Sequence, residues 1–213
     1  MANTGGCTVN DPRLGDVPER LHASYLLRPP KPGLPERRVA EQACDLVRAL
    51  LLPGPGVASR RQDTDLHCSR LADLLTPHLG SVALPELFAD LLPVRDLVLS
   101  DIEAAFANDP AAADRDVVVA SYPCIEALAV QRFAHRLYRR GIPLLPRMMT
   151  EVVHSRTGID IHPGASLGAS CFIDHGTGVV IGETAILGTH CVLYQGVGLI
   201  AWNPLAKDEN GSL

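Results

Sequence analysis

The sequence predicts an α+β protein in which a bundle of helices precedes a parallel β-solenoid built from six-residue repeats. Between Arg37 and His154, apolar residues recur at helical spacing, and after Gly158 aliphatic residues recur at every sixth position. Neither a helix nor an ordinary strand has a period of six residues. We therefore expect three regions: a proline-rich, flexible arm at residues 1–36, a helical domain at 37–156 and the start of a β-solenoid at 157–213.

Prolines, glycines and charged residues dominate the first region. Prolines stand at Pro12, Pro18, Pro29, Pro30, Pro32 and Pro35. A composition of this kind suits an extended chain better than a packed structure, because it offers few apolar side chains to bury. The sequence therefore predicts an extended arm here.

Five segments of the second region have apolar side chains at helical spacing. They are Val39 to Leu50, Leu66 to Leu75, Leu97 to Phe106, Ser121 to Gly141 and Leu144 to Ser155. The third helix should end before Pro110, because proline disfavours helical backbone in the residue that precedes it. The fourth should stop at Gly141, a residue type that commonly ends helices. The sequence thus predicts a bundle of helices.

In the third region, the period of six is carried by aliphatic residues, with one slip of two residues after Val179. These residues are Ile161, Leu167, Ile173 and Val179, then Ile181, Leu187, Leu193 and Leu199. Small or modest residues usually stand two positions earlier: Ala165, Cys171, Thr177, Ala185, Cys191 and Val197. Each hexad predicts a short strand and a corner, and three hexads make one triangular coil. The aliphatic side chains should point into the prism, and coils should stack roughly 4.8 Å apart.

Charge and composition exclude several classes of protein. The net charge of -5 and the lack of a basic, aromatic-rich patch argue against a nucleic-acid partner. No apolar stretch is long enough to span a bilayer, and Met1 to Pro12 does not look like a secretory signal. The six cysteines are scattered and form no CxxC pair, so we expect a reduced, cytoplasmic protein without a membrane segment.

The polar residues of the third region form three close segments. They read Gly158-Ile159-Asp160-Ile161-His162-Pro163, Ile173-Asp174-His175-Gly176-Thr177-Gly178 and Ile181-Gly182-Glu183-Thr184. With Gln195-Gly196-Val197 they resemble the signature of the serine acetyltransferases, which belong to the hexapeptide-repeat acyltransferases. The resemblance extends upstream through Tyr122-Pro123, Arg132 to His135 and Pro146 to Glu151, and covers about Asp109 to Gln195.

The resemblance implies a fold and an activity. The solenoid should be a left-handed parallel β-helix, although right-handed crossovers are the general rule. The implied reaction is transfer of an acetyl group from acetyl-CoA to the hydroxyl of L-serine, giving O-acetyl-L-serine for cysteine biosynthesis. Acetyl-CoA would be a co-substrate, and no permanently bound cofactor or metal is expected. Transfer would be direct, without an acyl-enzyme.

His175 is the candidate catalytic base. A serine hydroxyl needs a positioned base, and histidine, with an ordinary pKa of about 6.5, is suited to that role. Asp160 is the candidate carboxylate that orients the imidazole, since its distance of fifteen residues from His175 is close to one coil. By resemblance, Asp174 and Asp109 would bind the ammonium group of serine. The structural alternatives are a hydrogen-bonded histidine, a turn cap at Asp160 and a turn former at Asp109 before Pro110.

Partners and the acetyl-CoA site also follow from the resemblance. It implies a homo-oligomer, either a trimer or a dimer of trimers, and a cysteine synthase partner in full-length relatives only. Acetyl-CoA should bind to coils that relatives carry beyond the position of Leu213, after a loop resembling Trp202 to Gly211. We therefore expect little activity from this chain alone. The alternative function is a truncated, non-catalytic family member that retains only an assembly role.

Two further points remain open in the sequence. His162, His175 and His190 are 13 and 15 residues apart, which permits a metal-dependent hexapeptide protein of the carbonic anhydrase kind as a third hypothesis. Ile200 stands where the resembled family has a glycine, and a β-branched residue would be strained there if the position requires a positive φ.

Overall fold

The computed structural model describes residues 15–27, 33–52 and 61–201, which form two compact units, Met1–Leu34 and Pro35–Leu213. Among its described residues, the first unit contains one helix, α1 (Val17–Leu27), none of whose residues is buried. The expectation of an extended arm did not include this helix. The loop expected from Trp202 to Gly211 lies outside the described residues.

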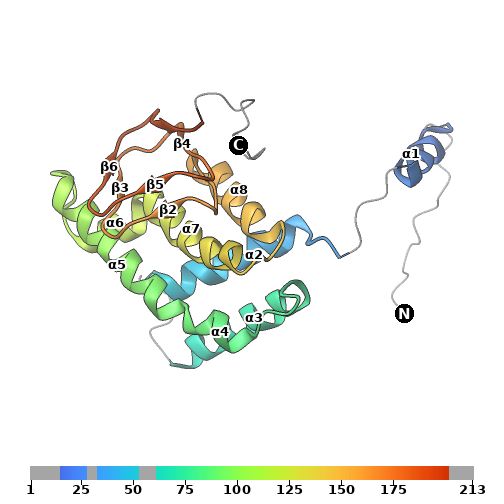
Figure 1. The fold of residues 1–213 in the computed structure, drawn as a ribbon, viewed down its shortest axis with the longest axis horizontal. Helices are drawn as coiled ribbons and strands as arrows, with labels where there is room; N and C mark the ends of the chain where they lie inside the picture. The colour runs from blue at the N-terminus through green and yellow to red at the C-terminus, as the bar shows by residue number, and fades with distance from the viewer. Residues whose placement is uncertain (1–14, 28–32, 53–60, 202–213) are drawn as a thin grey trace, which may run out of the picture. The chain divides into compact units, whose positions relative to one another are not determined.

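The second unit begins with helices (Figure 1). They are α2 (Arg37–Leu51), α3 (Arg61–Leu75), the short 3-10 helix η2 (Thr76–His78), α4 (Leu84–Ala89), α5 (Leu91–Asn108), α6 (Arg115–Ser121), α7 (Pro123–Arg139) and α8 (Leu145–Thr157). All five predicted helices are present, as α2, α3, α5, α7 and α8. Apolar spacing did not reveal α4 and α6, because six or seven residues are too few to show a helical period.

Helix α7 is the centre of this unit. It packs against α2, α5 and α8, and its side chains are buried on almost every face, as expected for a helix surrounded by other elements. Helix α8 leads from α7 to the strands and ends at Gly158, whose φ of 73° only glycine adopts without strain. In the part of the chain that the structure describes, no single helix is both long and apolar enough to cross a membrane, while the bent pair α6 and α7 passes by length and composition alone.

Up to residue 201, where the described part of the chain ends, seven short parallel strands follow α8. They are β1 (Ile159–Ile161), β2 (Ser166–Leu167), β3 (Phe172–Ile173), β4 (Val179–Ile181), β5 (Ile186–Leu187), β6 (Val192–Leu193) and β7 (Gly198–Leu199). They form three parallel sheets, in the orders β1-β4-β7, β2-β5 and β3-β6. Consecutive strands therefore belong to the three sheets in turn, and the chain visits each sheet before it returns to the first.

The predicted period of six matches these strands. All eight aliphatic residues that carry the period lie in strands, and most of them are buried. The slip of two residues is present, but it lies before Val179 and not after it, because Val179 already pairs with Ile159 in β1. Seven residue steps separate Ile173 from Val180, whereas five steps separate their partners on the next strands, Leu193 and Gly198. The two additional residues therefore lie between β3 and β4, and they enlarge the corner that contains Asp174 and His175.

A buried ion pair joins the helices to the strands. The guanidinium of Arg132 on α7 forms two hydrogen bonds of 2.7 Å to the carboxylate of Asp101 on α5, and both side chains are almost fully buried. Arg132 also donates to the carbonyls of Leu167 (3.1 Å) and Gly168 (2.8 Å), and Asp101 accepts the N–H of Cys171 at 2.9 Å. This network fixes the turn between β2 and β3 against α5 and α7, and so positions β3.

Gly168 provides a test of the coil stacking. A Cβ at this position would lie 2.4 Å from the carbonyl oxygen of Gly188 and 2.7 Å from the backbone nitrogen of Thr189, on the neighbouring coil. Because backbone atoms cannot move aside, we expect Gly168→Ala to lower the free energy of unfolding by roughly 1–3 kcal/mol, as overpacking does elsewhere. Urea unfolding would measure this loss.

The matched control is Gly188→Ala. Gly188 occupies the equivalent place on the next coil, and a Cβ there would meet no atom within 4 Å. Its substitution should leave the unfolding midpoint nearly unchanged. Equal effects of the two substitutions would contradict the described stacking.

The expectation of strain at Ile200 is wrong. Among the described residues other than glycine, φ is positive at Leu144, Ser170, His175 and His190, and Ile200 is not one of them. The backbone at Ile200 therefore accommodates a β-branched residue.

Candidate active site

The enlarged corner between β3 and β4 presents His175 to solvent. His175 has a φ of 57°, and the N–H of Gly176 donates to the carbonyl of Asp174 at 2.6 Å, across a three-residue turn. Gly176 follows with a φ of 75°, and its lack of a side chain matters because a Cβ there would lie 2.5 Å from the Ile159 side chain. The His175 side chain is 72% exposed, so its imidazole is free to receive a substrate.

Asp109 joins this corner from the helical part. It caps the C-terminal end of α5, where its Oδ1 accepts the N–H of Ala111 at 2.8 Å and its Oδ2 accepts the hydroxyl of Tyr122. The Asp174 carboxylate lies 3.6 Å from Nδ1 of His175. Asp109 interacts electrostatically with His175, and Tyr122 with Asp174, so the end of α5 and the junction of α6 with α7 lie near the corner after β3.

The charges of these groups influence one another. The Tyr122 hydroxyl, followed by the Ala111 N–H and the charge of His175, holds the pKa of the Asp109 carboxyl below its usual range. The hydrogen bond to Asp109, together with burial and the negative charges of Asp109 and Asp174, raises the pKa of Tyr122 to about 12. Near neutral pH, Asp109 is therefore an anion, and Tyr122 keeps its proton and donates it.

This arrangement suits a small molecule that carries both an ammonium and a hydroxyl group. Two carboxylates, those of Asp109 and Asp174, can accept hydrogen bonds from the ammonium. The exposed imidazole of His175 beside them can accept a proton from the hydroxyl. The geometry supplies a binding group and a base at one corner.

Asp160 lies elsewhere. It is the middle residue of β1, and because its neighbours Ile159 and Ile161 are buried, its side chain points to the opposite, outer face. There its Oδ1 accepts a hydrogen bond of 2.9 Å from Arg147, which also donates to Glu151. No hydrogen bond or ion pair in the described part of the chain joins Asp160 to His175. The structure thus brings together Asp109, Asp174 and His175, and not Asp160, within one chain.

One group of side chains has the spacing of a metal site. Ligand atoms of Glu151, His154 and Asp160 lie within 4.8 Å of one another. Arg147 donates to both carboxylates, so its guanidinium already supplies the positive charge that a cation would bring. This group does not fit a metal ion well.

The three histidines of the metal-dependent hypothesis stand at different corners. His162 follows β1, His175 follows β3 and His190 follows β5, so each lies between a different pair of sheets. His162 Nδ1 accepts the N–H of Gly164 at 3.0 Å, a bond that stabilises its own turn. A single chain does not bring these histidines together around one ion.

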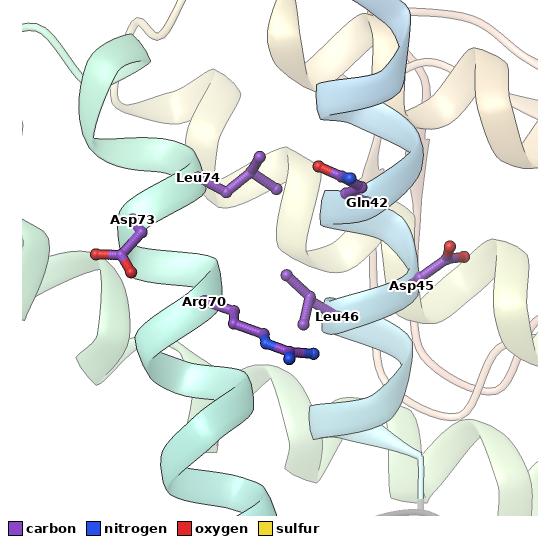
Figure 2. A pocket seen from close by; sticks show the side chains of 6 residues that line it. All are labelled: Gln42, Asp45, Leu46, Arg70, Asp73 and Leu74. Atoms are coloured by element: carbon purple, nitrogen blue, oxygen red, sulfur yellow. The ribbon is translucent and has the colours of Figure 1, made fainter. Parts of the chain in front are cut away.

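A separate hollow of about 560 Å³ lies between α2 and α3 (Figure 2). It is lined by Gln42, Asp45, Leu46, Arg70, Asp73 and Leu74. In Figure 2, Arg70 extends toward Leu46, while Asp45 and Asp73 point away from the gap between the helices. The hollow contains none of the residues that the sequence predicts for the site.

Two residues with clear roles in the site's architecture were missed from the sequence. Tyr122 and Arg132 lie in segments that carry the family resemblance, but neither was given a role. Tyr122-Pro123 marks a helix boundary, as Asp109-Pro110 does, because proline disfavours helical backbone in the residue before it. Each pair therefore places a polar side chain at a helix end. That signal predicts two boundaries, but not that the two side chains meet.

Comparisons with known proteins place the chain in a family, although no family model matches it. Over 95 residues it is 53% identical to "Serine acetyltransferase, plasmid" of Synechococcus elongatus, a match that covers 44% of this chain and 30% of that protein. The chain therefore spans less than a third of that relative's length.

Two solved structures from Entamoeba histolytica are also similar. Serine acetyltransferase isoform 3 in complex with cysteine is 37% identical, with a TM-score of 0.67, over 74% of this chain and 61% of that one. Serine acetyltransferase 1 in complex with L-cysteine is 30% identical, with a TM-score of 0.69, over 83% of this chain and 78% of that one. Given this shared sequence and fold over most of the second protein's length, the chain belongs to the serine acetyltransferase family.

Proposed function

We propose that this protein is a serine O-acetyltransferase, which transfers an acetyl group from acetyl-CoA to the hydroxyl of L-serine. The observation that carries the proposal is the convergence of Asp109, Asp174 and His175 at one exposed corner, from elements far apart in the sequence. The family supports the same reaction, and its solved members bind cysteine, an amino acid of nearly the same shape as serine.

In this proposal, Asp109 and Asp174 bind the ammonium of serine and direct its hydroxyl toward His175. His175 takes the hydroxyl proton as the serine oxygen attacks the thioester carbonyl. The new ester C–O bond forms, the C–S bond breaks, and the proton passes from the imidazolium to the departing CoA thiolate. The transfer is direct and needs no acyl-enzyme. Acetyl-CoA is a co-substrate in this scheme, with no permanently bound cofactor.

Asp160 retains its proposed role as the carboxylate that orients His175. The observed partner of Asp160 is Arg147, 2.9 Å away. For Asp160 and His175 to form a dyad, either this ion pair must open or the imidazole must reach the Asp160 carboxylate from another side. The carboxylate beside His175 in the structure is that of Asp174, 3.6 Å from Nδ1 of the imidazole. Asp174 can therefore stabilise the imidazolium even without Asp160. Asp160→Asn and Asp174→Asn would distinguish the two carboxylates, because the one that supports His175 during transfer should lower kcat when it is replaced.

The finer architecture is also proposed. The three sheets would be the faces of a left-handed parallel β-helix of hexapeptide repeats that begins near residue 157, after a helical domain at 37–156. The cyclic order of the strands among three sheets supports this reading. Exposed apolar side chains on outer strand faces, Ile186 and Val192, support a homo-oligomer, either a trimer or a dimer of trimers. A cytoplasmic role in cysteine biosynthesis fits the reaction.

The alternative of a non-catalytic family member with only an assembly role finds no support in the comparisons. The three similar proteins described above are each named a serine acetyltransferase. We therefore keep the enzyme as the proposed function.

The proposal is tested by release of CoA from acetyl-CoA in the presence of L-serine. The assay uses protein that carries the C-terminal coils of a relative after Leu213, because acetyl-CoA is expected to bind those coils, and the kinetic tests below use the same extended protein. It should release CoA only when L-serine is present, with O-acetylserine detected by mass spectrometry. Asp109→Asn should raise the KM for serine by at least about 10-fold, because it removes a charge-assisted contact to the ammonium. Glu103→Gln, a matched loss of charge on the exposed face of α5, should leave that KM unchanged. A folded extended protein without serine-dependent CoA release would contradict the proposed activity.

A further inference from the structure

We propose that Tyr122 is a positioning residue of the serine site, which holds the Asp109 carboxylate in the orientation that receives the substrate ammonium. The inference rests on the proposed function and assigns a role to a residue that does not need to touch the reacting atoms. It explains how an aspartate at the end of a helix, at the edge of the fold, keeps a single orientation.

The Asp109 carboxylate is held at both oxygens. Oδ1 accepts the N–H of Ala111 at 2.8 Å, a local turn contact, while Oδ2 accepts the hydroxyl of Tyr122 from a different element. A carboxylate held at one oxygen can still rotate about the bond that carries it. Each carboxylate oxygen can accept two hydrogen bonds, so both oxygens keep a free site for an ammonium.

Tyr122 itself has a fixed place. It caps the C-terminal end of α6 and the N-terminal end of α7, with φ and ψ of -84° and 116°. Pro123 after it restricts Tyr122 to extended backbone and begins α7. The N–H of Tyr122 donates to the carbonyl of Val118 at 3.1 Å. Two helices thus set the position from which the hydroxyl reaches Asp109.

The surrounding charges set the direction of the hydrogen bond. Tyr122 contacts Asp109 and interacts electrostatically with Asp174 after β3 and Cys124 on α7, and Asp109 interacts electrostatically with His175. Two neighbouring carboxylates disfavour loss of the phenolic proton, which raises the pKa of Tyr122 to about 12. The hydroxyl therefore remains a donor, and Asp109 remains its ionised acceptor.

Tyr122→Phe tests the role, because it keeps the ring and removes only the donor. We expect the dissociation constant of L-serine to rise about 10-fold, the usual scale for a lost hydrogen bond to a charged group. The melting temperature and the affinity for acetyl-CoA should stay near those of the wild type. Isothermal titration calorimetry with L-serine would measure the change in affinity.

The pH dependence of serine binding gives a second readout that a purely structural role would not move. Asp109 must be ionised to bind an ammonium, and Tyr122 is the first cause of its lowered pKa. Without that donor, the pKa of Asp109 should rise toward its ordinary value. As the pH is lowered, the variant should therefore lose its affinity for serine at a higher pH than the wild type does. A ¹³C NMR titration of the Asp109 carboxyl would detect the same rise directly, without any ligand.

Tyr138→Phe is the matched control. Tyr138 lies on α7 and donates its hydroxyl to the carboxylate of Glu183, so the substitution breaks the same kind of bond outside the site. It should leave serine affinity and its pH dependence unchanged.

The possible results separate the two proposals. If wild-type protein binds no L-serine, the proposed function is wrong and the role of Tyr122 falls with it. The other result is that the wild type binds L-serine and Tyr122→Phe binds it equally well, loses it at the same pH on acidification and keeps the same carboxyl pKa of Asp109. In that case only the role of Tyr122 is wrong.

Discussion

Replacement of His175 by asparagine should lower kcat by roughly 10²–10⁴-fold, the usual contribution of a general base. Asparagine is the informative choice, because His175 has a φ of 57° and asparagine tolerates that backbone better than alanine does. The variant should therefore fold, and its affinity for L-serine, set by Asp109 and Asp174, should change little. Steady-state kinetics of CoA release would give kcat and KM separately.

His190→Asn is the matched control for that substitution. His190 has nearly the same φ, 59°, but lies at the corner between β5 and β6. It should leave kcat near the wild-type value. Equal losses in the two variants would show that the effect comes from the backbone, and an unchanged kcat in His175→Asn would remove His175 from the mechanism.

Replacement of Arg132 by methionine should lower the free energy of unfolding by about 3–5 kcal/mol, as breaking a buried ion pair generally does. The substitution leaves the fully buried carboxylate of Asp101 without its partner and also removes donors from the carbonyls of Leu167 and Gly168. Burial already raises the pKa of Asp101, and removal of Arg132 strengthens that tendency toward a neutral carboxyl. Urea unfolding followed by circular dichroism would measure the loss.

Arg115→Met provides the comparison. Arg115 also forms two hydrogen bonds to one carboxylate, that of Glu103, but both side chains are more than half exposed. Solvent screens such a pair, so its loss should cost much less. If the two substitutions lowered the free energy of unfolding by similar amounts, this would contradict the claim that Arg132 holds the β2–β3 turn against the helices.

The repeat region could be predicted well because its signal is periodic. Eight aliphatic residues define the strands, and the slip of two residues is present. It lies before Val179, between β3 and β4, and not after Val179 as the sequence predicted. The same slip marks the corner that presents His175. Long helices were equally visible, whereas α4 and α6 were too short to show a period.

Contacts between distant segments could not be predicted in the same way. Asp101 and Arg132 are 31 residues apart on two helices, and nothing in either helical pattern selects this pairing. Spacing permitted Asp160 to face His175, but alternation along β1 turns Asp160 outward, toward Arg147 on α8. Residue spacing predicts which coil a side chain belongs to, and packing decides which neighbour it meets.

The most direct test of the central claim is a titration of ¹⁵N-labelled protein with L-serine, followed by NMR. The site proposed here predicts that the amide signals shifting most belong to residues around Asp109, Tyr122, Asp174 and His175, and that these shifts are lost in Asp109→Asn. Shifts concentrated instead at the hollow between α2 and α3 (Figure 2), around Leu46 and Arg70, would contradict the assignment of the β3–β4 corner as the serine site.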